Sequence, residues 1–437
     1  MKSFLYVQPK ALSHESRQAE MEMRKTARRG KQSELGKRYA LIKEPKDAPR
    51  SSTMKAKLLS DTAKLRSPLG YLNAGYPNFD TLFGRDALIA GWQMLHIDSS
   101  FARGALHHLA YYQATTFSDG TDRQPGKILH VLESNTMPGR EMPYFGSVDA
   151  TPLFVIVAGE YFRVTQDKAF LLRIWPNVIA AINWILVLGD SDHDHFIEYE
   201  KKTPHGDFHQ GWKDCREDHL KITPPVAIVE AQGYVYAAYR SAASLAEQLG
   251  RDTANLWLDK AQELKEAFHK PFWWETESYY YIGLDGSKIP RESVSSNPGH
   301  LFFTGIIPEH VLPKIIQRIF QPDLFTPYGI RTLSERDPDF DSFSYHLGSV
   351  WPHDNWIIYN GLRKLGFTEE ADRIKQALLL AYREMGYMPE LYRVEDGEIF
   401  PLTEGPEYVH HPGPNTGYAN RLQAWAICGL LDMIWKD

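Results

Sequence analysis

The strongest constraint on the fold is the succession of helical segments that fills the chain from about residue 53 onward. Apolar residues recur at helical spacing in eleven segments, and an alternating strand pattern is almost absent. Start signals such as Asp98-Ser99-Ser100 and end signals such as Gly366 flank several of the segments. The pattern predicts an all-α domain with helices at about 54–65, 84–97, 99–115, 149–165, 168–189, 225–249, 252–270, 308–319, 347–365, 369–385 and 416–435.

The connections between these segments alternate in length. Short turns lie near residues 95–99, 165–168, 250–253 and 366–369, whereas the long connections cover about 116–148, 190–224, 271–307, 320–346 and 386–415. Long loops in a compact domain usually carry function. A toroid of helical hairpins would gather these loops on one face. An open helical solenoid is the alternative, but the sequence has no repeat of solenoid length, so we expect a closed barrel.

Composition narrows the possible partners. The net charge is -6 and the pI is about 6.3, which argues against nucleic acid or an anionic membrane as a partner. The two cysteines cannot build a disulfide framework or a cysteine metal cluster. The N-terminal MKSFLYVQPK lacks the apolar core of a signal peptide, and the sequence has no uninterrupted stretch of 18 apolar residues. We therefore expect a cytoplasmic protein.

Residues 1–50 differ from the rest of the chain because they hold 13 Lys and Arg against 6 Asp and Glu. They form either a basic arm for a partner or, as we favour, a solvated extension that packs on or flanks the barrel. The stretch from Pro45 to Ser52 has the composition of a linker. We expect the catalytic domain to cover residues 51–437.

Four clusters in the long loops and at helix starts carry candidate chemistry. Phe83-Gly84-Arg85-Asp86 places an ion pair at the start of an apolar helix, where it could grip two sugar hydroxyls or complement the helix dipole. Gly211-Trp212-Lys213-Asp214 sets a carboxyl beside an indole, which can raise the pKa of a general acid; a solvated loop pair is the alternative.

The other two clusters lie further along the chain. In Ser344–Asn355, the residues His346, His353 and Asp354 could suggest a metal site, but the spacing lacks a well-placed third ligand, so we expect no metal and no cofactor. Met388-Pro389-Glu390 offers a carboxylate that is either a general base or a solvated loop residue. One carboxylic acid, Asp214, and one carboxylate, Glu390, form the pair that glycoside hydrolysis requires.

The ordered motifs resemble the amylo-α-1,6-glucosidase group of glycoside hydrolases, the glucosidase half of glycogen-debranching enzymes, which is related to processing α-glucosidases and glucoamylases. The motifs are FGRDALI, SVDATPLFV, QGWKDC, AIVEAQGYVYAAY, SNPGHLFFTGI, SYHLGSVWPHDN, MPELY and LQAWA. The resemblance covers about residues 70–435. It implies an (α/α)6 barrel and an inverting mechanism.

The resemblance also implies roles for individual residues. Asp214 would be the general acid and Glu390 the general base, while Arg85 and Asp86 would hold the outer hydroxyls of the sugar in the −1 subsite. The residues expected to line the same pocket are Asp149, Trp212, Glu230, Gln232, Trp351, His353, Asp354 and Gln423.

We therefore predict an exo-acting α-glycosidase, most simply an α-glucosidase that removes a terminal glucose from a small carbohydrate. A hydrolase of glucosylglycerate or mannosylglycerate and a debranching α-1,6-glucosidase are the nearer alternatives. A sugar isomerase or epimerase and a non-catalytic carbohydrate-binding scaffold are more distant ones. Because the chain has no β-rich N-terminal domain of the kind many relatives carry, we expect short substrates, with loop 392–415 (Glu404, Glu407, His410 and His411) bounding the aglycone side.

Overall fold

The computed structural model describes residues 51–133, 139–402 and 419–435. The described part is mostly helical, as the sequence predicts, and belongs to one compact unit, Ser51–Asp437. The basic segment 1–50 and the four residues proposed to bound the aglycone side lie outside the described residues. The helices are α2 (Ser51–Lys64), α3 (Gly84–Gln93), α4 (Ser100–Tyr111), α5 (Ala150–Thr165), α6 (Lys168–Trp184), α7 (Val229–Gln248), α8 (Ala254–Phe272), α9 (Leu312–Ile319), α10 (Pro352–Leu365), α11 (Thr368–Met385) and α12 (Ala424–Trp435).

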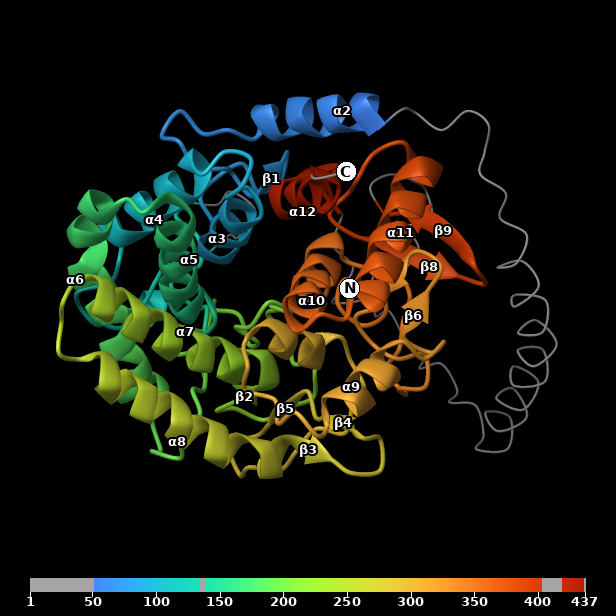
Figure 1. Ribbon diagram of the computed structural model, residues 1–437. Coiled ribbons are helices and arrows are strands. Elements are labelled where there is room, and N and C mark those ends of the chain that lie inside the picture. The colour runs from blue at the N-terminus through green and yellow to red at the C-terminus, as the bar shows by residue number, and fades with distance from the viewer. Residues whose placement is uncertain (1–50, 134–138, 403–418, 436–437) are drawn as a thin grey trace, which may run out of the picture. The chain divides into compact units, whose positions relative to one another are not determined.

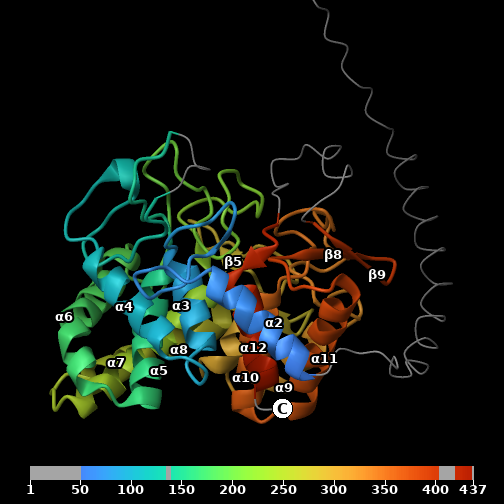
Figure 2. The ribbon, with the colours of Figure 1, turned by 90° about the horizontal axis from the view of Figure 1, so that it is seen from above.

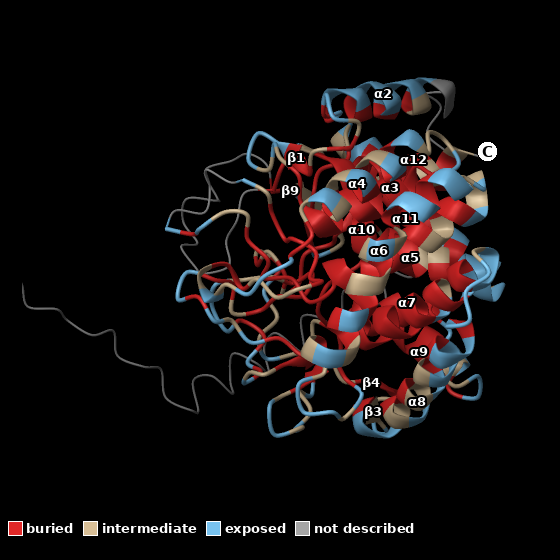
Figure 3. Ribbon diagram, turned by 90° about the vertical axis from the view of Figure 1, so that its left-hand side faces the viewer, coloured by how far each residue is buried: buried red, intermediate tan, exposed pale blue. Residues whose placement is uncertain are grey.

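The helices form two layers (Figure 1). The 3-10 segment η3 (Asn297–Phe303) joins five helices in a closed ring of contacts that runs from α3 to α5, α7, η3, α10, α12 and back to α3. A second layer packs outside this ring: α2 on α12, α4 on α3 and α5, α6 on α5, α8 on α7, α9 on η3, and α11 on α10. The ring elements are the more buried of the two layers (Figure 3).

The long connections lead into the ring elements, and short turns lead out of most of them. The chain crosses residues 112–149, 190–228, 273–296, 320–351 and 386–423 before it enters α5, α7, η3, α10 and α12. Figure 2 shows these connections gathered on one side of the helices. The N-terminal ends of the ring elements therefore meet the long loops, as the alternating connection lengths predict.

Several element boundaries differ from the prediction; for example, helix α12 begins at Ala424 rather than near residue 416. The ring element η3 lies inside the expected loop 271–307, because Asn297-Pro298-Gly299 starts a 3-10 segment that helical periodicity does not reveal. Helix α10 begins at Pro352 rather than near residue 347, since a proline is well tolerated only in the first turn.

Short strands form hydrogen-bonded pairs within the long loops, and two of these pairs join different connections. Within the described ranges, each of the five sheets has two antiparallel strands: β1 (Gly75–Tyr76) with β10 (Leu422–Gln423), β2 (Ala227–Ile228) with β5 (Gly283–Leu284), β3 (Trp273–Trp274) with β4 (Tyr279–Tyr280), β6 (Phe325–Thr326) with β7 (Gly329–Ile330), and β8 (Tyr392–Glu395) with β9 (Glu398–Pro401). The β1–β10 pair joins the chain just before α3 to the chain just before α12.

One helical stretch, Lys168–Gly189, is long and apolar enough to cross a membrane by length and composition. It comprises α6 and the π-helical turn η2 (Ile185–Gly189). In the structure it packs against α5 and α7 and buries Phe170, Ile174 and Val178. A core helix of a soluble protein passes the same test.

Candidate active site

The candidate residues gather at the N-terminal ends of the ring elements. Arg85 and Asp86 lie in the first turn of α3, Asp149 caps α5, and Glu230 lies in the first turn of α7. Trp351, His353 and Asp354 open α10, and Gln423 directly precedes α12. The positive ends of helix dipoles stabilise carboxylates placed there. The loops before α7 and α12 carry Asp214 and Glu390 to the same region.

Asp214 is held by one oxygen. Its Oδ2 accepts a hydrogen bond from Arg85 Nη1 at 3.0 Å, and its side chain keeps 27% of its surface exposed. Burial raises the pKa of Asp214 to about 7, although the Arg85 guanidinium opposes the shift. The carboxyl can therefore carry a proton near neutral pH, and Oδ1 has no hydrogen-bond partner among the described residues. A general acid needs both properties.

Glu390 is buried, and both of its oxygens accept hydrogen bonds. Tyr345 Oη donates to Oε1 at 2.5 Å, and the backbone N–H of Asn420 donates to Oε2 at 2.8 Å. Burial raises the pKa of Glu390 to about 8, while these two hydrogen bonds lower it. The nearby carboxyls Asp86 and Asp214 raise it further. Two donors on one carboxylate favour its charged form, the form that a general base uses.

A hydrogen-bonded chain links Glu390 to Asp86. The Asn420 side chain donates to Gln423 Oε1 at 3.1 Å, and Gln423 Nε2 donates to Asp86 Oδ1 at 3.2 Å. Burial raises the pKa of Asp86 to about 7, against the opposing charge of Arg85. Asp86 Oδ2 has no hydrogen-bond partner among the described residues, so it could accept a hydroxyl from a bound sugar.

Arg85 holds the Asp214 side chain in place through a hydrogen bond. Its Nε donates to Asp149 Oδ2 at 2.8 Å and its Nη2 to the Gly211 carbonyl at 2.8 Å, while Nη1 holds Asp214. Asp149 is completely buried and also accepts Ser147 Oγ at 2.8 Å. The structure thus places Arg85 and Asp149 as supports of the acid loop, whereas the resemblance implies direct sugar contacts.

Aromatic rings form a wall around Trp212. The Trp212 ring stacks on His300 at 5.7 Å and meets Trp351 edge-on at 5.8 Å and His353 edge-on at 5.1 Å. His353 in turn lies flat on Trp425 at 3.7 Å. These side chains are buried, so their packing fixes the position of the loop that ends in Asp214.

A group of buried charges lies beside this wall. Lys213 is 1% exposed; its Nζ donates to the Thr332 carbonyl at 2.6 Å, and it is attracted by Asp354 and Glu230. Asp354 Oδ1 pairs with His300 Nε2 at 2.7 Å. Neither oxygen of Glu230 has a hydrogen bond of normal geometry from the described residues, and burial raises its pKa to about 7.

The Gln232 side chain makes hydrogen bonds to the backbone of Ile197 and Ile228. Its Oε1 accepts the Ile197 N–H at 2.9 Å, and its Nε2 donates to the carbonyls of Ile197 at 2.9 Å and Ile228 at 3.0 Å. Both amide hydrogens are therefore engaged with the chain. This arrangement gives Gln232 a loop-anchoring role, and the sugar contact that the resemblance implies stays a prediction.

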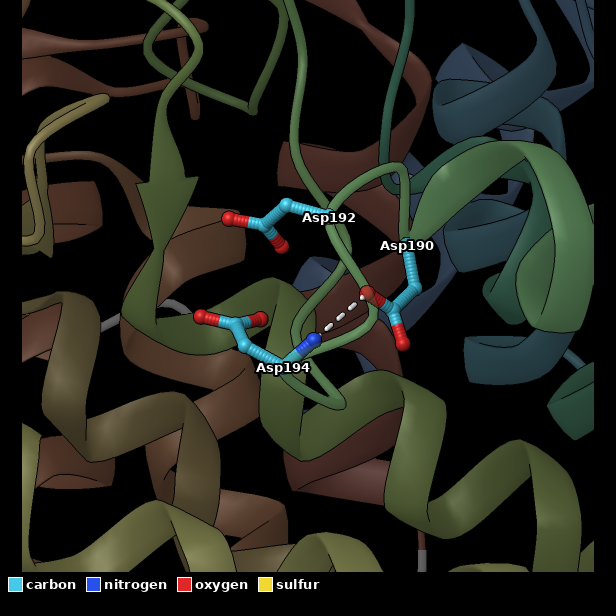
Figure 4. Close-up of side chains that lie close together, drawn as sticks. All are labelled: Asp190, Asp192 and Asp194. Carbon is cyan, nitrogen blue, oxygen red and sulfur yellow. Dashed lines mark hydrogen bonds between the residues drawn. The ribbon is translucent and has the colours of Figure 1, made fainter.

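The histidines of the third motif do not gather as a metal site. Among the described residues, the one group of three possible ligand atoms within 4.8 Å of one another is Asp190, Asp192 and Asp194 (Figure 4). The Lys288 ammonium contacts Asp192 at 2.9 Å and Asp194 at 2.7 Å. Asp190 instead accepts the backbone N–H of Asp194 at 3.1 Å. Two of the three carboxylates are thus already paired with the Lys288 ammonium.

Sequence reasoning missed four residues of the site: Tyr345, Asn420, Lys213 and His300. Tyr345 lies inside a motif singled out above, but no local pattern shows that its hydroxyl meets a carboxylate 45 positions later. Asn420 acts through its backbone, for which the sequence gives no signal. For Tyr345, its place between Ser344 and His346 in a quoted motif was the signal that could have pointed to the site.

Comparison with known proteins identifies a family. The model of the mannosylglycerate hydrolase MGH1-like glycoside hydrolase domain matches residues 84–411. The chain is 25% identical to the mannosylglycerate hydrolase of Rubrobacter radiotolerans over 202 residues, or 45% of this chain and 41% of that protein. It is 39% identical to mannosylglycerate hydrolase MGH1 of Selaginella moellendorffii over 49 residues, or 11% of this chain and 10% of that protein. The matched segments thus span less than half the length of these relatives.

Solved structures share the fold. The GH63 mannosylglycerate hydrolase of Thermus thermophilus, in complex with Tris and D-glycerate, superposes with a TM-score of 0.65 at 14% identity. The match covers 88% of this chain and 100% of that one. A rhamnosidase from Klebsiella oxytoca with rhamnose bound has a TM-score of 0.60 at 14% identity, over 88% of this chain and 63% of that one. Both comparisons support the helical architecture described above.

Proposed function

Because the chain belongs to the mannosylglycerate hydrolase MGH1-like family of glycoside hydrolases, we propose that it hydrolyses a small α-glycoside of glycerate. The family membership replaces the resemblance to debranching enzymes, and it favours the glycerate-glycoside alternative over the α-glucosidase interpretation. The family membership also favours hydrolysis over the isomerase and binding-scaffold alternatives. We further propose that the closed ring of helices is an (α/α)6 barrel with the reaction at its long-loop end.

The observation that carries the mechanism is the contrast between the two carboxyls. Asp214 is fixed through Oδ2 and leaves Oδ1 to protonate the departing glycosidic oxygen. Tyr345 and Asn420 each donate a hydrogen bond to Glu390 and so favour its carboxylate form, which would take a proton from water. The water would attack the anomeric carbon from the face opposite the leaving group and give inversion. Asp86, oriented by Gln423, would hold a sugar hydroxyl.

Substrate assays test this proposal. We expect kcat/KM for mannosylglycerate or glucosylglycerate to exceed that for maltose, isomaltose and a glycogen limit dextrin by about tenfold or more. A glucan that is cleaved best, counted per non-reducing end, would restore the debranching interpretation. Faster turnover of free monosaccharides than of these glycosides would contradict glycoside hydrolysis as the reaction.

Variants test the assigned carboxyls. Asp214→Asn and Glu390→Gln should each lower kcat by about 10²–10⁴-fold, the contribution of general acid–base catalysis. Asp218→Asn is the matched control, because Asp218 lies on the same loop but pairs with His209 at 2.8 Å. Near-normal turnover by Asp214→Asn would contradict the assignment.

A further inference from the structure

A pocket next to the loop that carries Asp214 lies outside the proposed active site. Its wall includes Phe117, Asp122, Arg123, Lys127 and Gln210, but none of the carboxyls of the proposed active site. Gln210 is four positions before Asp214 in the chain, and its carbonyl accepts the Val148 N–H at 2.9 Å. The pocket therefore adjoins the acid loop and is separate from the site of hydrolysis.

Turns in left-handed conformation build the positive side of this pocket. Asp122 has φ 52° and Gly126 has φ +89°. A Cβ on Gly126 would lie 2.2 Å from the Ala180 carbonyl oxygen, so the turn needs glycine both for its conformation and for space. The two turns set Arg123 and Lys127 on one wall.

The acidic side chains of the wall are mostly satisfied. Asp122 accepts hydrogen bonds from the Lys202 and Thr203 N–H groups at 2.7 and 3.1 Å, and from Tyr144 Oη and Gln210 Nε2, both at 3.0 Å. The remaining buried or rim carboxylates, Glu198 and Glu200, are paired with Lys288 and Lys202. Asp119 is exposed at the rim and can face water.

The two cations lack such partners. Lys127 is 5% exposed, and its ammonium makes one long hydrogen bond among the described residues, 3.5 Å to the Asp122 carbonyl, beside the Trp184 ring at 5.5 Å. The Nε atom of Arg123 is buried without a hydrogen-bond partner in the same part of the chain, and its guanidinium lies 5.1 Å over the Phe145 ring. A buried cation is costly unless it is paired. The wall thus contains an ammonium that makes one long hydrogen bond and a guanidinium whose Nε is unpaired among the described residues.

We propose that this pocket is a second, non-catalytic binding site for a small oxyanion, a carboxylate or phosphate group carried on a polyol. The Arg123 guanidinium would hold two oxygens of the oxyanion, and the Lys127 ammonium would supply a second positive charge. The occupant would touch Gln210 and so contact the segment that leads to Asp214. This proposal depends on the pocket alone, so it stands or falls separately from the proposed reaction.

Calorimetric titration of the full chain with inorganic phosphate, and separately with D-glycerate, tests the site. Substitutions of Arg123 and Lys127, which lie outside the proposed active site, distinguish binding in this pocket from binding of glycerate at the active site. We expect at least one probe to bind at millimolar or lower concentration. Phosphate binding alone would identify a phosphorylated ligand, and glycerate binding that is weakened by substitution of Arg123 or Lys127 would identify a carboxylate. No heat from either probe would overturn the proposal.

Charge-removing variants locate the binding. Lys127→Met and Arg123→Gln should each weaken the probe by about tenfold or more, as expected when a charge-assisted hydrogen bond is lost. Lys201→Met removes the same charge next to the pocket, where Lys201 lies over the Phe208 ring, and should change the affinity less than about twofold. Arg123→Gln keeps the test valid if Lys127→Met does not fold, since Arg123 is partly exposed. Unchanged affinity in folded Arg123→Gln and Lys127→Met would refute the site.

Discussion

At the scale of single residues, the hydroxyl of Tyr345 lowers the pKa of Glu390 against the effect of burial. Burial raises the pKa of Glu390 to about 8, and the Tyr345 hydrogen bond at 2.5 Å opposes that shift. Tyr345→Phe removes the donor and should raise the pKa further, by about 1–2 units. Because the base must be deprotonated, the acidic limb of the kcat/KM profile should move to higher pH by the same amount.

A second tyrosine provides the control for this measurement. Tyr392 Oη donates to the Tyr328 carbonyl at 2.6 Å in the core and does not contact Glu390. Tyr392→Phe should lower stability but leave the pH profile in place. Equal profiles for Tyr345→Phe and the wild type would show that Glu390 is not the base.

The spacing of the two carboxyls makes a further prediction. An inverting enzyme separates its acid and base by about 6.5–9.5 Å, and we expect Asp214 and Glu390 to lie in that range when substrate is bound. An α-linked substrate should then release the β-anomer first, which proton NMR can follow before mutarotation. Initial release of the α-anomer would indicate retention and a nucleophilic carboxylate.

At the scale of elements, glycines set how closely the ring helices approach. Gly361 of α10 faces η3, where an added Cβ would lie 2.5 Å from Phe302 Cβ and 2.8 Å from the Phe303 backbone nitrogen. The backbone cannot move aside as a side chain can. Gly361→Ala should therefore destabilise the protein by about 1–3 kcal/mol in urea unfolding, despite the better helix propensity of alanine.

Gly159→Ala in α5 is the comparison for this test. Its added Cβ would lie 3.0 Å from Ser241 Cβ and 3.2 Å from Ser241 Oγ, which is a looser contact than the 2.5 Å approach to Phe302 Cβ, and Ser241 is partly exposed. We expect a smaller change or a gain in stability, because alanine favours the helix by about 1 kcal/mol. Equal losses of unfolding free energy in both variants would mean that the contact between residue 361 and η3 does not cause the destabilisation.

At the scale of the whole molecule, the buried charges inside the ring make stability depend on pH. Burial raises the pKa of Glu230 from 4.5 to about 7. A raised pKa in the folded state means that the stability present below pH 4.5 is lost as the pH rises through about 7. Glu230→Gln should therefore gain about 3 kcal/mol over the wild type between pH 4.5 and pH 8.

Urea unfolding of both proteins at the two pH values measures this gain. Glu266→Gln on the exposed side of α8 is the control, because Glu266 is solvent-exposed and pairs only with Gln262 at 2.7 Å among the described residues. It should show no comparable pH-dependent difference. A pH-independent effect of Glu230→Gln would show that Lys213 and His300 keep Glu230 charged throughout.

The sequence alone determined the helical content, the alternation of short and long connections, and the motifs that hold Asp214 and Glu390. These features are local: helical periodicity, turn residues and short motifs are complete within a few consecutive positions. The membership of Tyr345, Asn420 and Lys213 in the site, the support of Asp214 by Arg85, and the ring position of η3 were decided by the tertiary structure. Arg85 meets a carboxylate 129 positions away, and Gln423 meets Asp86 across 337 positions. Such contacts exist only after the helices close into a ring, because closure brings the N-terminal ends of distant segments together.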